Sequence, residues 1–144
     1  MSATARVLAP FARQKTVLLT TYRRDGTPVR TPVSIAVEGG HAYIRSYETA
    51  GKTKRLRRNP MVEVAPSTWR GRPTGPAIRA HARRVDGEEA AHAARLLARK
   101  NPLLQGVLVP LTHRSNRAKY GATVHFKLTP VVPVEPARSA ETAA

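Results

Sequence analysis

The sequence predicts a mainly β fold with added helices (α+β), in the form of a small antiparallel β-barrel. Three β-strand patterns follow one another in the first third of the chain, joined by the tight-turn signals Asp25-Gly26 and Gly39-Gly40. The second of these patterns, Val29 to Val37, is apolar on both faces. A strand that is apolar on both faces is typical of the wall of a closed barrel and not of an open sheet with one face in water.

The first third of the chain contains one short helix and three strands. Residues 4–13 are expected to form the helix, with Val7, Leu8 and Phe11 on its packing face. Pro32 lies within the second strand and predicts an edge or bulge position, because proline lacks the backbone N–H of a ladder. Alternating apolar residues between turn residues predict strands over 16–22, 29–37 and 42–46.

Three further strands and one longer helix are predicted after a basic segment at residues 46–60. The strand patterns cover 61–66, 77–85 and 122–128. The helix begins after Asp86-Gly87 and ends at Lys100, before Asn101-Pro102. Its predicted apolar side consists of small residues and one leucine: Ala90, Ala93, Ala94 and Leu97.

The other segments are connections and ends. Trp69 to Pro76 has the composition of a loop. Residues 103–111 are apolar, and their length suits either a helix or a strand. We expect an N-terminal helical arm at 1–13, a barrel domain at 14–129 and a flexible C-terminal tail at 130–144.

Charge and composition limit the classes of function. The net charge of +16 favours anionic partners, which include nucleic acid, anionic membrane surfaces and acidic small molecules. The absence of cysteine excludes disulfides and cysteine-bound metals, and the five histidines are not spaced as metal ligands, so no metal site is expected. No apolar run reaches the roughly 20 residues of a membrane helix, and the N-terminus lacks a signal-peptide run. A cytoplasmic protein without membrane association is expected.

The basic segment at residues 46–60 is the strongest functional signal. Ala50-Gly51 forms a turn after the third strand, and a short helix is expected to follow it. The free N–H groups and the dipole of a helix start attract phosphate or carboxylate. Lys52, Lys54 and Arg55 add mobile positive charge. We therefore predict an anion site at this helix start, with a solvated basic helix surface as the alternative.

No residues typical of acid–base or nucleophilic catalysis stand out. The chain has nine acidic residues, which are spread along its length, and it contains no Ser-His-Asp or Cys-His arrangement. Catalytic residues and a proton donor are therefore not assigned. This pattern is compatible with redox chemistry, in which a cofactor supplies the reaction and the protein binds, orients and excludes water.

The order of elements resembles that of the split β-barrel family of pyridoxamine 5'-phosphate oxidases and flavin reductases. Lys52, Leu56, Asn59 and Pro60, placed after the third strand, carry this resemblance. The resemblance covers about residues 10 to 130. Other segments are similar to the actinobacterial branch that uses a deazaflavin, coenzyme F420: Asp25-Gly26-Thr27-Pro28, Arg30-Thr31-Pro32-Val33, residues 51–60 and Arg70-Gly71-Arg72-Pro73-Thr74-Gly75. The oxidase branch usually has Ser-Arg where this chain has Ala50-Gly51, which favours the deazaflavin branch.

The resemblance implies a homodimer with two cofactor sites at the subunit interface. It also implies hydride transfer from reduced coenzyme F420 to a small unsaturated or carbonyl-type substrate. Lys52, with Lys54 or Arg55, would bind the cofactor phosphate at the helix start. The implied cofactor-binding residues are Gly51, Lys52, Lys54, Arg55, Thr31, Pro32, Val33 and Trp69. We infer that the acidic oligoglutamate tail of the cofactor would use the surplus cations Arg55, Arg57, Arg58, Arg70 and Arg72.

Other readings of the same residues stay open at this point. The fold could hold FMN, as an oxidase or flavin reductase, or it could carry the deazaflavin without turnover. A basic barrel could also bind single-stranded nucleic acid, with aromatic residues as stacking platforms: Tyr22, Tyr43, Tyr47 and Trp69. Against nucleic acid, the aromatic residues are few and the cations cluster around one turn. Aromatic residues such as these more often fill a core or an interface, and Thr31 has an ordinary strand alternative.

Overall fold

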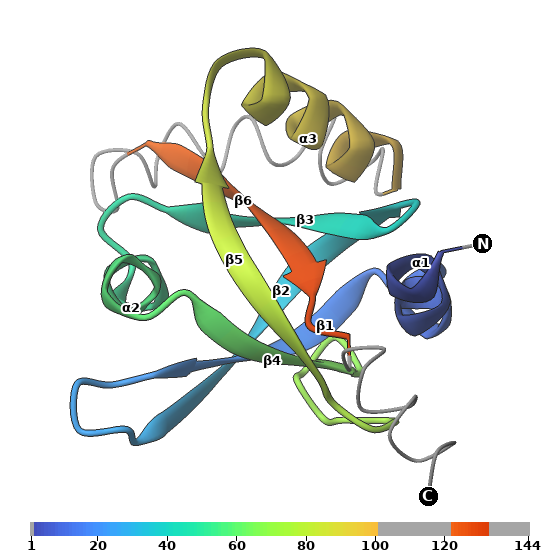
Figure 1. Cartoon of the computed structure of the whole chain (residues 1–144). Helices are drawn as coiled ribbons and strands as arrows, with labels where there is room; N and C mark the ends of the chain where they lie inside the picture. The colour runs from blue at the N-terminus through green and yellow to red at the C-terminus, as the bar shows by residue number, and fades with distance from the viewer. Residues whose placement is uncertain (1, 101–121, 133–144) are drawn as a thin grey trace, which may run out of the picture.

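The computed structural model describes residues 2–100 and 122–132 as a closed barrel of antiparallel strands with three short helical segments and one longer helix (Figure 1). The strand order around the barrel is β1-β2-β3-β6-β5-β4. The strands are β1 (Thr16–Tyr22), β2 (Pro28–Glu38), β3 (His41–Tyr47), β4 (Met61–Pro66), β5 (Ile78–Val85) and β6 (Thr123–Pro130). The helical segments are α1 (Ala3–Leu8), the 3-10 turn η1 (Ala9–Phe11), α2 (Gly51–Arg58) and α3 (Gly87–Lys100).

The predicted antiparallel barrel of the α+β class is confirmed. Each of the six predicted strands corresponds to an observed strand, with ends that differ by at most two residues. The predicted helix at 4–13 is divided into α1 and η1 at the position before Pro10. The apolar stretch at 103–111 and the tail beyond residue 132 lie outside the described residues.

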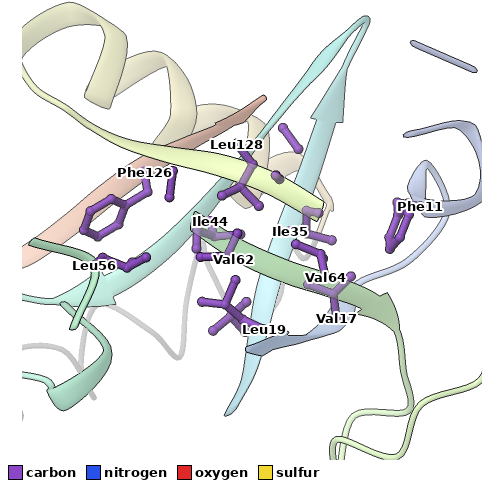
Figure 2. Packing of buried hydrophobic residues seen from close by; sticks show 14 of the residues in the cluster. Phe11, Val17, Leu19, Ile35, Ile44, Leu56, Val62, Val64, Phe126 and Leu128 are labelled. Atoms are coloured by element: carbon purple, nitrogen blue, oxygen red, sulfur yellow. The ribbon is translucent and has the colours of Figure 1, made fainter. Parts of the chain in front are cut away.

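The barrel interior is filled mainly by aliphatic side chains (Figure 2). Alternate residues of each strand point inward, as Val17 and Leu19 do in β1. Phe126 and Phe11 lie toward opposite ends of this cluster in Figure 2. Leu56 of α2 joins the cluster beside Phe126, so the core fixes where α2 sits.

The β1–β2 hairpin is closed by the predicted Asp25-Gly26 turn. Gly26 adopts a positive φ of 88°, a conformation that side chains with a Cβ rarely adopt. The Asp25 carboxylate accepts a hydrogen bond from the backbone N–H of Thr27 at 3.0 Å. Arg23 N–H donates to the carbonyl oxygen of Thr27 at 2.9 Å, which completes a rigid turn.

Strand β2 has an open edge over its first half. β2 pairs with β1 from Pro28 to Ser34, whereas its pairing with β3 begins only at Ile35. Ile35 N–H donates toward β1, to the carbonyl of Lys15, so the even-numbered residues of β2 direct their backbone groups to the other side. On that open side the carbonyl groups have no partner strand among the described strands. The prediction that Pro32 occupies an edge position is confirmed.

Helix α3 covers the outer face of β2, β3 and β6. Its own residues Ala93 and Leu97 are buried, but Ala94 is exposed, so the predicted apolar side was wrong at Ala94. The buried sector of α3 is centred on Ala93 and Leu97, and Ala94 lies about 100° around the helix from Ala93, outside this sector. Tyr43 lies buried under α3 and donates a hydrogen bond to Glu89 Oε2 at 3.0 Å. Tyr43 is therefore a packing residue and not a stacking platform.

Candidate functional site

Helix α2 presents its first turn without a side-chain cap. It begins at Gly51, after Ala50 in an extended conformation (φ −64°, ψ 146°) that gives no capping side chain. The turn is held in place by Thr53, whose Oγ1 donates to the carbonyl oxygen of Tyr47 at 2.6 Å and lies 2.8 Å from Ser46 Oγ. The N–H groups of this turn keep the partial positive charge of a helix start. The sequence prediction of a helix start at this position is confirmed.

Lys52 lies in this first turn and is half-buried. Burial lowers the pKa of its amine below the usual value, and the Arg55 guanidinium lowers it further. Within residues 2–100 and 122–132, the carboxylates form ion pairs with other cations and not with Lys52. A partly desolvated ammonium group without a counter-ion is stabilised by an anion placed beside it. The surroundings of Lys52 therefore favour anion binding.

Arg55 folds back over the start of the same helix. A Cβ at Gly51 would lie 2.9 Å from Arg55 Nη1, so Gly51 leaves room for this guanidinium. Arg55 Nε donates a hydrogen bond of 2.6 Å to Thr21 Oγ1, near the end of β1. Burial lowers the pKa of Arg55, and the positive charges of Arg23 and Arg58 add to this effect. Arg55 is therefore oriented by a neutral hydroxyl group while its charge stays available.

A groove of about 450 Å³ lies on the outer face of the barrel, across β2, β1 and β4. Even-numbered residues of β1 line it, because the odd-numbered residues point into the core. Its apolar lining includes Leu18, Pro32 and Ala65, and its polar lining includes Thr20, Arg30, Glu63 and Arg70. Such a groove can hold a flat, mainly apolar ring with a few polar atoms.

The loop after β4 borders this groove. Gly71 N–H donates to the carbonyl oxygen of Thr68, which closes a tight turn. Gly71 adopts a positive φ of 89° in this turn, a conformation that glycine reaches more easily than other residues do. A Cβ at Gly71 would lie 3.6 Å from Leu18 and from Pro32, in ordinary contact. The predicted loop is confirmed, and its turn approaches the groove floor closely.

The predicted ring-lining residues of β2 point in opposite directions. Pro32 lines the groove, whereas the side chain of Val33 is buried in the barrel core. Thr31 lies on the same side of the strand as Val33, and its Oγ1 is buried without a hydrogen-bond partner in the described part of the chain. Only Pro32 of these three thus presents its side chain to the groove, and the backbone of all three lies on the half of β2 with the open edge.

Two other predicted site residues are exposed. Trp69 is 74% exposed, and the guanidinium carbon of Arg70 lies 4.8 Å from the centre of its ring. Lys54 is also exposed, in α2. A contact of Trp69 with a cofactor or a partner subunit stays a prediction, and so does phosphate binding by Lys54.

Three groups of the site were missed in the sequence. Arg30 and Glu63 line the groove, and Thr21 anchors Arg55. The two-residue alternation of β2 could have identified Arg30, since Arg30 and Pro32 share a face. No sequence signal pairs Thr21 with Arg55, which is 34 positions away.

Burial raises the pKa of Tyr22, and Glu63 raises it further.

The anchoring role of Thr21 gives a first test. We expect Thr21→Val to weaken the binding of inorganic phosphate about fivefold, because Arg55 loses the hydrogen bond that orients it. Isothermal titration calorimetry measures this effect, and Thr16→Val on the same strand is the matched control, expected to stay within a factor of about two of the unsubstituted protein. Equal affinities of the two variants would show that the contact between Thr21 and Arg55 plays no part in anion binding.

The sequence model of the family described as "Pyridoxamine 5'-phosphate oxidase" matches residues 3–130 of the chain. The chain belongs to the pyridoxamine 5'-phosphate oxidase family. The predicted resemblance is therefore confirmed for the family as a whole, and the deazaflavin branch stays a prediction. No curated protein matches the chain.

Solved structures share the fold at low sequence identity. HutZ, the heme storage protein from Vibrio cholerae, is 14% identical over 90% of this chain and 92% of that chain, with a TM-score of 0.64. A FAD-binding protein from Mesorhizobium loti is 15% identical over 92% and 90%, with a TM-score of 0.60. An F420-H2 dependent reductase is 18% identical over 79% and 93%, with a TM-score of 0.56. The names of these three proteins refer to three different groups, namely heme, FAD and coenzyme F420. The shared fold therefore does not identify the ligand of this chain, which must be argued from the site.

The described residues show neither a metal cluster nor a membrane helix. Residues 2–100 and 122–132 contain no group of three or more His, Cys, Asp or Glu side chains arranged to hold a metal ion. Over the same ranges, none of the helices combines the length and the apolar character needed to cross a bilayer. The site is therefore described by its cations, its hydroxyl groups and its groove.

Proposed function

We propose that the protein is an oxidoreductase that binds the deazaflavin coenzyme F420 and passes a hydride to a small unsaturated or carbonyl-type substrate. The observation that carries this proposal is the uncapped start of α2, where Lys52 is half-buried and has no carboxylate partner in the described part of the chain. This arrangement suits a phosphate group. Membership of the pyridoxamine 5'-phosphate oxidase family supports a phosphate-bearing redox cofactor at this position.

The residues of the site fit such a cofactor. Lys52, the N–H groups of the first turn of α2 and Arg55 would hold the phosphate. Pro32 and the groove beside it would hold the ring. The open edge of β2 offers backbone carbonyls, together with the N–H groups of Arg30 and Ser34, to polar atoms on a ring edge. When bound, the reduced deazaflavin would supply the hydride.

The protein's own contribution in this proposal is binding, orientation and exclusion of water. Leu18, Pro32 and Ala65 give the groove an apolar part, against which a bound ring would be shielded from water on one face. Glu63 is an acidic residue in this lining; burial raises the pKa of Tyr22, and the nearby Glu63 charge raises it further. We do not assign a proton donor. A homodimer in the cytoplasm, with the groove completed by the second subunit, is part of the proposal.

The choice of a deazaflavin over FMN rests on charge. Ala50-Gly51 precedes Lys52, in place of the Ser-Arg usual in the oxidase branch, and cations continue along α2 and into the β1–β2 turn. A cofactor with several negative charges beyond its phosphate would balance these cations better than FMN would.

A fluorescence titration of the full chain tests the proposal, with coenzyme F420 and FMN added separately at low and moderate salt. We expect saturable binding of F420 that weakens as salt rises, since the contacts are partly electrostatic. Binding of FMN alone would contradict the deazaflavin assignment and move the protein to the flavin branch. Binding of neither would leave the family fold without a redox role. Once F420 binds, reduction of candidate substrates followed by its absorbance separates an enzyme from a carrier.

A further inference from the structure

A second group of cations lies at the tip of the β1–β2 hairpin. An open hollow of about 440 Å³ is lined by Arg23, Arg24 and Asp25 from the hairpin and by Arg58 from the end of α2. The hairpin extends out beside α2 (Figure 1). The charges of Arg23 and Arg58 also act on Arg55, which connects this hollow to the start of α2. The hollow therefore lies next to the proposed phosphate site but has its own residues.

One carboxylate, that of Asp25, lies among the three guanidinium groups of this hollow. Glu48 pairs with Arg84 at 3.0 Å and with Arg57 at 3.5 Å, and none of these three residues lines the hollow. The Asp25 carboxylate accepts the Thr27 N–H and keeps its negative charge, on which the Arg23 charge acts. Three guanidinium groups share the hollow with this one carboxylate, which leaves a local excess of positive charge.

The cations are presented by rigid elements. The hairpin turn is closed by the Arg23–Thr27 backbone hydrogen bond of 2.9 Å and a second bond from Gly26 N–H to the Arg23 carbonyl oxygen, also 2.9 Å. Arg58 is the last residue of α2, whose position is fixed by Leu56 in the core. The positive charges of Arg23 and Arg58 both act on Arg55, and a polyvalent anion bound among like charges removes part of their repulsion. Arginine suits this role, because its planar guanidinium can donate two parallel hydrogen bonds to one phosphate or carboxylate.

We propose that Arg23, Arg24 and Arg58 form a second anion subsite for a small polyvalent anion that carries two or more phosphate or carboxylate groups. The anion is either an extension of the ligand held at Lys52 or a free polyvalent anion. Sequence analysis assigned Arg57 and Arg70 to the acidic tail of the cofactor, and the proposed subsite contains neither of them. Arg57 pairs with Glu48, and Arg70 lines the groove across β2, β1 and β4. It does not depend on whether the cofactor is a deazaflavin or FMN.

Calorimetric titration of the full chain with inorganic tripolyphosphate tests the subsite. Inorganic phosphate, which has a single phosphate group, is titrated for comparison. We expect tripolyphosphate to bind about tenfold more tightly than phosphate, and Arg58→Gln or Arg23→Gln to remove most of this difference, as expected for the loss of a charge-assisted contact. Arg99→Gln on α3 is the matched control, because Arg99 is exposed and its loss changes the net charge equally. Thermal unfolding of each variant verifies that it is folded.

The outcomes separate this subsite from its alternatives. An equal loss of tripolyphosphate affinity in Arg58→Gln and Arg99→Gln would overturn the proposal, because only the net charge would then matter. A single-stranded oligonucleotide that binds more tightly than tripolyphosphate, with the same loss of affinity in both variants, would also overturn it in favour of non-specific polyanion binding.

A second titration distinguishes an extension of the ligand held at Lys52 from a free polyvalent anion. Arg58→Gln is titrated with coenzyme F420 and with FMN. A selective loss of F420 affinity indicates an extension of the bound ligand, and loss of tripolyphosphate affinity alone indicates a free anion. Failure of the proposed function would leave the tripolyphosphate result intact.

Discussion

Lys52→Met is expected to weaken the binding of coenzyme F420 about 30-fold, since it removes a charge-assisted contact worth roughly 2 kcal/mol. Methionine keeps most of the aliphatic stem of Lys52, so packing at the start of α2 is retained. Because Lys52 is partly desolvated and lacks a carboxylate partner in the described residues, its replacement is not expected to lower the free energy of unfolding. The expected signature is therefore a loss of affinity without a loss of stability, measured by fluorescence titration and by urea unfolding.

The matched control for this experiment is Lys15→Met. Lys15 is an exposed lysine immediately before β1, at the end of that strand remote from Thr21 and Arg55. Its replacement changes the net charge by the same amount, so a purely long-range electrostatic effect would appear in both variants. A 30-fold loss that appeared equally in Lys15→Met would show that no localised phosphate site exists at Lys52.

The second large effect is expected from pH acting on His125. His125 lies in β6 between β3 and β5 and is buried, with an exposed fraction of 8%. Burial lowers the pKa of its imidazole to about 4, and the Arg45 guanidinium contributes. In the unfolded chain the pKa is about 6.5, so below that pH the unfolded state binds more protons than the folded state does. Stability is therefore lost as pH falls from about 6.5 toward 4.

Single-site linkage gives a loss of about 2 kcal/mol between pH 7.5 and pH 5 for these two pKa values. We expect His125→Gln to remove this part of the pH dependence, because glutamine does not titrate. Urea unfolding at both pH values measures it as the difference between the unsubstituted protein and the variant. His81→Gln is the control, because His81 is exposed on β5. If His125→Gln kept the full pH dependence, the imidazole of His125 would have to titrate near its ordinary pKa in the folded protein.

Local sequence signals were sufficient to predict the strands and turns of the barrel. Asp25-Gly26 and Gly39-Gly40 mark hairpin turns because Gly26 and Gly39 need positive φ values, of 88° and 58°. Pro60 ends α2 through its effect on the residue before it. The start of α2 was predicted from the same kind of local signal, because Ala50-Gly51 follows a strand and precedes a run of cations.

Features that depend on long-range pairing were not predictable in the same way. The open edge of β2 follows from the register of β3, in which pairing begins only at Ile35. The orientation of Arg55 depends on Thr21, which is distant in sequence and adjacent only after the barrel closes. Burial of His125 depends on its two neighbouring strands. The opposite orientations of Pro32 and Val33, in contrast, follow from strand alternation and could have been predicted.

The two prolines in the open half of β2 limit how the barrel can aggregate. An exposed strand edge is a template on which a second chain can add a strand, and that process needs backbone N–H donors at every other residue. On the open edge those positions include Pro28 and Pro32, which have no N–H to give. A neighbouring chain therefore meets interrupted hydrogen bonding along this edge. The opening can stay accessible to a small molecule without becoming a seed for intermolecular sheets.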